Sequence, residues 1–584
     1  MSEIESNIAP GTIEKALTGI EGFDEITGGG LPRRRTTLLL GGPGSGKTVF
    51  ALNTLVNGAR LYGEPGIFVA FEENSAQIFQ NAASFGWELP ALVEQQLFFL
   101  DARMSVSQIK TGGFDLTGML AGLLAKSQDM SAATGKLTRI VFDSADVLLN
   151  HLRNPYAEME EMQRIHEWLA NHRFTGIITS KAQLPGSALP DQRDYLQYMA
   201  DCVIELKRGM IENVSNRSLT VVKYRGSSFA ENAASLVIGP DGIQVPNLSL
   251  FGMTYPVSNE RISTGIERLD VMLSGGYLRG SSVLITGSPG TSKSTLAGAF
   301  AHAACRRGER ALYVSFDEGP NEIIRNLASV NLGLRQHVQS GMLRIYSTRA
   351  EVQNAVEHLV QIKRLLREHQ PQVLVIDPLS AMAIAGGEQL AKTVAQRLIY
   401  ETKAANITLF LTSLLQENNP EVEATPIEIS TIADAWIHLS YVVQAGERNR
   451  ALTIIKARGT QHSKQVRELV LSSQGISLTD AYTAGGAVLM GTLRSEKEAA
   501  DREARQQMHL EQQNRRRSLM LKQAEARARL ELIQQELASQ QVELDLLDSE
   551  IGREDRQHQV DLDERRTLRG GHLDAGQNGS LTGA

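Results

Sequence analysis

The stretch TTLLLGGPGSGKT, residues 36–48, decides the fold of this chain. Its first part is apolar and strand-like, its second part matches GxxxxGK[ST], and the residues after it carry apolar side chains at helical spacing. A strand that leads through such a loop into a helix points backbone N–H groups at phosphate oxygens. We therefore expect Lys47 to reach the β- and γ-phosphates of ATP and the Thr48 hydroxyl to coordinate Mg²⁺. The loop consists of Gly41, Gly42, Pro43, Gly44, Ser45, Gly46, Lys47 and Thr48.

The region around this loop is repeated later in the chain. Residues 18–41 read TGIEGFDEITGGGLPRRRTTLLLG, and residues 264–287 read TGIERLDVMLSGGYLRGSSVLITG. Five ordered matches of this kind indicate a tandem duplication. The other four pairs are GIFVAFEEN (66–74) with ALYVSFDEG (311–319), TRIVFDSADVL (138–148) with PQVLVIDPLSA (371–381), GIITSKAQ (176–183) with LFLTSLLQ (409–416), and VVKYRGSS (221–228) with TIIKARGT (453–460).

Each copy alternates strand-like apolar runs with amphipathic helical stretches, which predicts a largely parallel sheet flanked by helices. RIVFD (139–143) and VLVID (373–377) are apolar almost throughout, as central strands buried on both faces are. The predicted fold class is α/β, with two tandem P-loop NTPase domains. We place the first domain at residues 1–247 and the second at 248–490.

The second copy has a phosphate-binding loop with one departure from the pattern. Ser292 replaces the glycine before the lysine, and we expect its Cβ to be tolerated if the backbone there is already helical. The lysine and the hydroxyl are retained, so nucleotide binding is expected in this copy too. The loop consists of Gly287, Ser288, Pro289, Gly290, Thr291, Ser292, Lys293 and Ser294.

Carboxylates follow two strands of each copy. Asp143 and Asp377 end buried strands and are placed to hold Mg²⁺ through its water shell. A helix-capping aspartate is the alternative, but the match between the copies favours the metal. A second group follows the strand after each loop helix, where a carboxylate can take a proton from water or a hydroxyl. Glu73 and Glu318 align and are the expected general bases, assisted by Glu72 and Asp317; an exposed acidic turn is the alternative.

A basic pair near the end of each copy lies on alternate residues of a strand, so both side chains face the same way. The pairs are Lys223 with Arg225 and Lys456 with Arg458. They suit delivery from one subunit to the γ-phosphate bound by the next, an arginine-finger role that predicts a ring. The alternative is a solvated basic strand.

Together these features resemble the KaiC family, over residues 12–490. The resemblance rests on the TG-I start before each loop, the paired acidic residues and the K-x-R-G segments. It implies RecA-like domains in a double-ring homohexamer with ATP between subunits. It further implies that the first half is chiefly an ATPase and the second a slow autokinase and autophosphatase, with a KaiB-like or other signalling protein as partner.

The resemblance also points to phosphorylation sites in TPIEISTIAD, residues 425–434. Ser430 and Thr431 align with the two adjacent phosphorylated residues of the family, and Thr425 with a nearby third hydroxyl. The first copy has Gln197 and Tyr198 instead. Without the alignment, a helix N-cap would explain a Ser-Thr pair equally well.

From about Thr492 the composition changes to Glu, Arg, Gln, Ala and Leu. We predict a helical, coiled-coil extension over 491–566 and a disordered tail over 567–584, with a single exposed helix as the alternative. This extension differs from the short C-terminal peptide of the clock proteins, so a KaiA-type partner is not expected. Most of its seam positions are apolar: Leu519, Leu530, Ile533, Leu537, Leu544, Leu547 and Ile551, with Gln523, Ala526 and Gln540 between them.

Composition and charge disfavour several classes of partner and site. A net charge of −7 argues against a nucleic-acid partner, and two cysteines without a CxxC argue against a disulfide framework or a zinc site. No basic-then-apolar leader or run of ~18 apolar residues occurs, so a cytoplasmic protein without a membrane contact is expected. Three functions stay open: a KaiC-like ATPase and Ser/Thr autokinase using ATP and Mg²⁺, a hexameric ATP-dependent scaffold that recruits a partner through its coiled coil, and a DNA-handling RecA or helicase relative.

Overall fold

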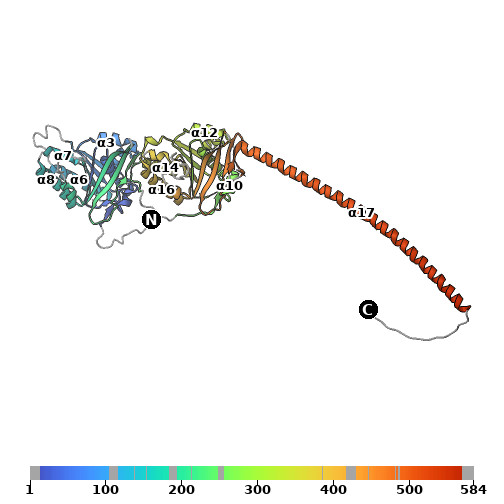
Figure 1. Ribbon diagram of the computed structural model, residues 1–584. Helices are drawn as coiled ribbons and strands as arrows, with labels where there is room; N and C mark the ends of the chain where they lie inside the picture. The colour runs from blue at the N-terminus through green and yellow to red at the C-terminus, as the bar shows by residue number, and fades with distance from the viewer. Residues whose placement is uncertain are drawn as a thin grey trace, which may run out of the picture. The chain divides into compact units, whose positions relative to one another are not determined.

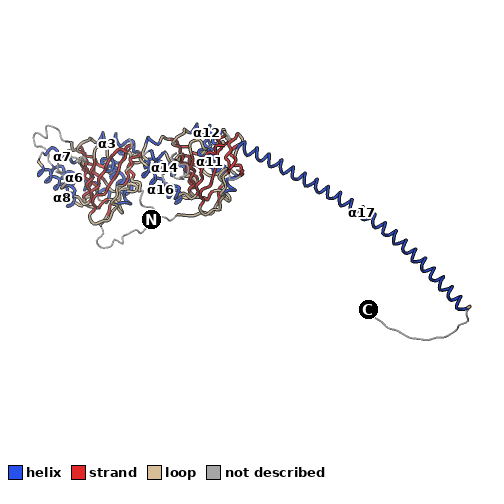
Figure 2. Tube along the Cα trace, viewed as in Figure 1, coloured by secondary structure: helices blue, strands red, loops and turns tan. Residues whose placement is uncertain are grey.

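The computed structural model describes residues 13–568 except for 104–115, 137, 153, 183–193, 212–213, 248–254, 385, 416–428, 445, 481 and 485–486. Within these residues two large, mostly parallel sheets flanked by helices follow one another along the chain (Figures 1 and 2). The predicted α/β class and the tandem RecA-like domains are confirmed.

The first sheet has eight strands in the order β10-β9-β8-β3-β7-β6-β4-β5. Its strands are β3 (Thr36–Gly41), β4 (Gly66–Ala70), β5 (Leu97–Asp101), β6 (Arg139–Asp143), β7 (Thr175–Ser180), β8 (Cys202–Ile211), β9 (Val214–Tyr224) and β10 (Ala234–Ser235). The helices of this half are α1 (Phe23–Ile26), α2 (Lys47–Tyr62), α3 (Ser75–Ala82), α4 (Leu89–Gln95), α6 (Leu116–Thr134), α7 (Ala145–Leu152), α8 (Pro155–Asn171) and α9 (Tyr195–Met199).

The second sheet has nine strands in the order β17-β16-β18-β19-β15-β20-β21-β22-β23. They are β15 (Ser282–Gly287), β16 (Ala311–Ser315), β17 (Leu343–Ser347), β18 (Val373–Asp377), β19 (Thr408–Leu414), β20 (Ala435–Gln444), β21 (Glu447–Ala457), β22 (Arg467–Ser472) and β23 (Gly475–Asp480). The helices are α10 (Glu267–Met272), α11 (Lys293–Arg306), α12 (Pro320–Ala328), α13 (Leu334–Gln339), α14 (Ala355–His369), α15 (Ala381–Ile384) and α16 (Glu388–Ala404).

The two sheets have the same topology. Read from β5 to β9 and from β17 to β21, each strand of the first sheet has a counterpart in the same place in the second. In both, the strand before the phosphate-binding loop lies centrally: β3 between β7 and β8, and β15 between β19 and β20. Carboxyl ends of neighbouring parallel strands meet at one edge, so the loop, the strand-end aspartate and the acidic turn of each half are brought together.

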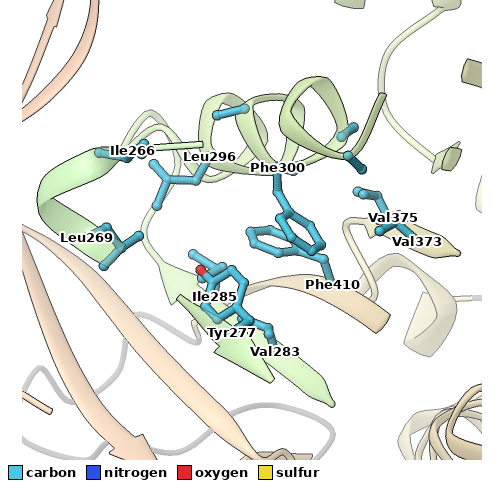
Figure 3. Close-up of a cluster of buried hydrophobic side chains, with 14 of the residues drawn as sticks. Ile266, Leu269, Tyr277, Val283, Ile285, Leu296, Phe300, Val373, Val375 and Phe410 are labelled. Carbon is cyan, nitrogen blue, oxygen red and sulfur yellow. The ribbon is translucent and has the colours of Figure 1, made fainter. Parts of the chain in front are cut away.

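Each sheet is covered on both faces because successive side chains of a buried strand point in opposite directions. In the first half Leu39 packs with residues of α2, whereas Leu38 packs with residues of α6, α7 and α8 on the opposite face. In the second half one face packs against α11. Figure 3 shows Phe300 of that helix beside Phe410 of β19, with ring centroids 5.5 Å apart.

Residues 489–584 form a separate unit. Nearly all of its described part is one continuous helix, α17 (Gly491–Thr567), and no residue of that helix is buried (Figure 1). The helical extension predicted from the sequence is therefore present, and its apolar seam positions are exposed in the single chain; Leu530, for example, is 57% exposed. No helix in the described part of the chain is long and apolar enough to cross a membrane.

Candidate active sites

The first phosphate-binding loop connects β3 to α2 as predicted. Gly44 and Gly46 have φ of 68° and 103°, a left-handed backbone that glycine adopts without strain. The Lys47 ammonium donates to the carbonyl oxygens of Gly41 (2.7 Å) and Gly42 (3.1 Å), so it lies folded over the loop that would receive phosphate. Burial lowers the pKa of Lys47, while Asp146 and Asp143 oppose this shift.

Asp143, at the end of β6, lies next to this loop. Its carboxylate accepts hydrogen bonds from the hydroxyls of Thr179 (2.8 Å) and Thr48 (3.1 Å). Burial raises its pKa to about 6, although both hydroxyls and Lys47 favour the ionised form. A hydroxyl and a carboxylate side by side are hard oxygen donors of the kind that Mg²⁺ prefers, so this pair fits the metal that the sequence implies.

The second loop repeats the lysine geometry. The Lys293 ammonium donates to the carbonyl oxygens of Gly287 and Ser288, each at 2.9 Å. Burial lowers its pKa to about 8, which Asp377 and Asp317 partly oppose. A bound anionic phosphate would favour the charged ammonium, so nucleotide and proton binding at this lysine are coupled.

The condition under which we expected the Cβ of Ser292 to be tolerated, a helical backbone, is not met. Its φ of 78° and ψ of 31° are left-handed, as at Gly46, and not those of a right-handed helix. A Cβ in this region approaches the following carbonyl oxygen and costs about 1–2 kcal/mol. The turn that precedes the lysine requires this conformation whichever residue occupies it, so the second half carries a strained residue where the first has glycine.

Asp377, at the end of β18, is held differently from Asp143. Its Oδ1 accepts a hydrogen bond from Thr412, the counterpart of Thr179. Its Oδ2 accepts a hydrogen bond of 2.7 Å from the hydroxyl of Tyr313, a fully buried residue of β16. Among the described residues no hydrogen bond joins Asp377 to Ser294, the counterpart of Thr48.

The predicted general bases have equivalent surroundings in the two halves. Glu73 accepts from the amide of Asn81 at 3.2 Å, and Glu318 accepts from the amide of Asn326 at 3.1 Å. An asparagine on the following helix, eight residues later, therefore orients each glutamate. The sequence analysis missed Asn81 and Asn326, although the equal spacing of each asparagine from its glutamate is visible in the sequence.

Of the assisting carboxylates, Asp317 has a raised pKa. The causes are burial and the negative charge of Asp377, and Arg349 opposes them.

Lys181 is a further charged residue that sequence reasoning missed. It follows β7, and its ammonium lies 3.5 Å from buried Asp146 and 3.8 Å from Glu72. The second half has Leu414 at the equivalent position, immediately visible in the aligned segments GIITSKAQ and LFLTSLLQ. The first site thus contains a second lysine beside Lys47, whereas the second site has leucine at the equivalent position.

The basic pairs lie against the segment that carries Ser430 and Thr431 in the second half and against its aligned counterpart in the first. The Lys456 ammonium donates to the carbonyl oxygens of Ser430 (3.1 Å) and Thr431 (2.9 Å), and Arg458 donates to that of Thr431 (2.7 Å). Both hydroxyl residues lie in the short 3₁₀ helix Ile429–Thr431, where Ser430 is partly exposed and Thr431 is exposed.

In the first half, the ammonium of Lys223 and the guanidinium of Arg225 contact the carbonyl oxygens of Gln197 and Tyr198 in the same way. Each basic pair therefore holds the backbone of the aligned segment within its own chain. Thr425 falls outside the described residues.

Comparison with known proteins agrees with this geometry. The family model for the KaiC ATPase matches residues 16–249 and 262–482. The circadian clock protein KaiC2 of Synechocystis sp. is 40% identical over 541 residues, which cover 91% of this chain and 93% of that protein. The circadian clock oscillator proteins KaiC of Parathermosynechococcus lividus and Parasynechococcus marenigrum are 33% and 32% identical, over 82% of this chain and 88% and 93% of theirs. The chain therefore belongs to the KaiC family of ATPases.

Proposed function

We propose that both halves hydrolyse ATP with Mg²⁺ and that the second half also transfers the γ-phosphoryl group to Ser430 and Thr431. The observation that carries the kinase proposal is the position of this pair. Lys456 and Arg458 hold its backbone, while the equivalent residues of the first half hold Gln197 and Tyr198, which lack an aligned Ser-Thr pair.

Phosphoryl transfer requires a base near the acceptor hydroxyl, and the carboxylate of Glu318, which follows β16, would fill this role. The Oγ of Ser430 or Thr431 attacks the γ-phosphorus, the bond from that phosphorus to the β–γ bridging oxygen breaks, and ADP leaves. Glu318, oriented by Asn326, accepts the hydroxyl proton. Mg²⁺, held by Ser294 and through water by Asp377, would neutralise charge on the phosphates, and Lys293 would bind the β- and γ-phosphates. In the first half Glu73 orients water instead.

We further propose a homohexameric ring with ATP between subunits. An acceptor in one subunit would then reach the γ-phosphate held by the loop of the next, and exposed Arg225 and Arg458 would contribute to the neighbouring site. A phosphate added at Ser430 or Thr431 would place negative charge next to Lys456 and Arg458 and would alter the proposed subunit interface. A KaiB-like or other signalling protein in the cytoplasm is the expected partner; a KaiA-type partner, a membrane and nucleic acid are not.

Intact-mass measurement after incubation with Mg-ATP tests the kinase. We expect wild type to gain one or two phosphates at Ser430 and Thr431, and Glu318→Gln to gain none. Glu73→Gln is the matched control in the other half and should still be phosphorylated. No incorporation into wild type over a day would overturn the kinase proposal.

The exposed seam of α17 favours a second candidate, an ATP-dependent scaffold without kinase activity. Large apolar side chains recur along the helix without burial in the single chain, as expected of a coiled-coil strand that lacks its partner helix. Removing residues 491–584 should then abolish partner recruitment and leave ATP hydrolysis unchanged. The DNA-handling alternative would require salt-dependent binding to single-stranded DNA.

A further inference from the structure

Tyr313 is the residue that distinguishes how the two halves hold their metal-site carboxylates. In both halves one oxygen of the strand-end aspartate accepts from an equivalent threonine, Thr179 or Thr412. The other oxygen differs: in the first half it faces the loop and accepts from Thr48 at 3.1 Å, and in the second half it accepts from Tyr313 at 2.7 Å.

The difference originates in one position of the strand next to the aspartate. Phe68 of β4 and Tyr313 of β16 occupy the same register, opposite Val141 and Val375, and both are fully buried. Phe68 packs on Phe99 with ring centroids 5.4 Å apart and has no donor to offer. The phenolic hydroxyl is the one group that the second half adds here.

A buried phenol needs a partner for its O–H group, and the carboxylate is the strongest acceptor within reach. A hydrogen bond to a carboxylate withdraws electron density from that oxygen and fixes its direction. When Mg²⁺ is bound, the Asp377 carboxylate would also accept from metal-bound water or from Ser294. The hydrogen bond from Tyr313 therefore makes Oδ2 of Asp377 a weaker and less freely directed acceptor for the metal site.

We propose that Tyr313 is a positioning residue that turns Asp377 away from Ser294 and weakens the affinity of the second half for divalent metal. The inference rests on the Mg²⁺-dependent ATPase proposed above. The first half, with Phe68, keeps its Thr48–Asp143 pair assembled for the metal, while the second must break the Tyr313 bond or accept a less basic ligand. The metal site of the second half therefore fills at a higher concentration of divalent metal than the metal site of the first half does.

Binding of Mn²⁺, followed by electron paramagnetic resonance on the full chain with saturating ADP, measures this directly and needs no turnover. We expect two classes of nucleotide-dependent site, and Lys293→Ala should remove the weaker one. In Tyr313→Phe the weaker class should bind Mn²⁺ about tenfold more tightly, the size of one hydrogen bond to a charged group. Phe68→Tyr, the reciprocal variant, should weaken the tighter class by a similar factor.

The two variants also separate positioning from packing. A merely structural hydrogen bond would lower the unfolding temperature of Tyr313→Phe without moving either Mn²⁺ class, and that result would overturn the inference. So would unchanged binding in Phe68→Tyr, which does not depend on how well Tyr313→Phe folds. Absence of any nucleotide-dependent Mn²⁺ binding in wild type would instead overturn the proposed ATPase, and this inference with it.

Discussion

The two halves of the chain have one topology and two different sites. Both curl a lysine over the loop carbonyls, both end a buried strand on an aspartate, and both orient a glutamate with an asparagine. They differ in the residue before the loop lysine, which is Gly46 or Ser292, and in the hydroxyl that contacts the aspartate, which is that of Thr48 or Tyr313. Only the first half has a lysine at position 181 or its equivalent, and only the second has the aligned Ser-Thr pair. The loop lysine, the strand-end aspartate and the glutamate with its asparagine recur in both copies, whereas the groups around them have diverged.

Replacing the two loop lysines one at a time should change the activities of the two halves more than any other substitution proposed below. Lys293→Ala should abolish phosphate incorporation at Ser430 and Thr431, because the γ-phosphate loses its buried ammonium partner. Lys47→Ala should abolish most steady hydrolysis, measured as ADP release, and leave incorporation in place. Equal loss of both activities in both variants would show that the halves do not divide the labour.

The pH dependence of stability tests the first metal site. Because the pKa of Asp143 rises from 3.8 to about 6 on folding, the folded state binds more protons in that window. Stability of the metal-free protein should therefore fall by about 3 kcal/mol as pH rises through the folded pKa of Asp143, starting near the unfolded value. Denaturant titrations between pH 4 and 7 measure the slope.

Two controls test whether Asp143 causes this pH dependence of stability. Asp143→Asn should flatten it, because the amide does not titrate, and Mg²⁺ with ADP should suppress it in wild type by favouring the ionised carboxylate. An undiminished slope in Asp143→Asn would place the responsible group elsewhere.

Lys181 should matter in the first half alone. Lys181→Leu removes the cation beside buried Asp146 and Glu72 and leaves Asp146 without its ion pair. Hydrolysis by the first half should fall about tenfold in kcat, with a smaller change in KM, if the charge acts on the reacting phosphate. Lys181→Arg, which keeps the charge, should retain more activity; equal losses in the two variants would contradict an electrostatic role.

Much of this architecture could be predicted from the sequence. Ordered motifs along two copies fix the strand that precedes each loop and the carboxylates that follow the strands, because parallel topology brings those ends together. The contacts of Tyr313, Asn81 and Lys181 could not be predicted in this way. They depend on which side chain of a neighbouring element reaches the aspartate or glutamate.

The conformation of Ser292 was left open by the sequence for a related reason. The helical pattern begins at the lysine, but the tight turn before it requires a left-handed residue. Glycine at this position would indicate that requirement, and serine does not.

The smallest expected effect is at this turn. Ser292→Gly should raise the free energy of unfolding of the second half by about 0.5 kcal/mol, because relief of the left-handed Cβ exceeds the added flexibility of glycine in the unfolded chain. Gly46→Ser, the reciprocal variant, should cost more, since its Cβ would lie 2.9 Å from Ile238 Cδ1. Denaturant unfolding of the nucleotide-free protein measures both. If Ser292→Gly is destabilising, the serine is stabilised by its surroundings and the second loop is as relaxed as the first.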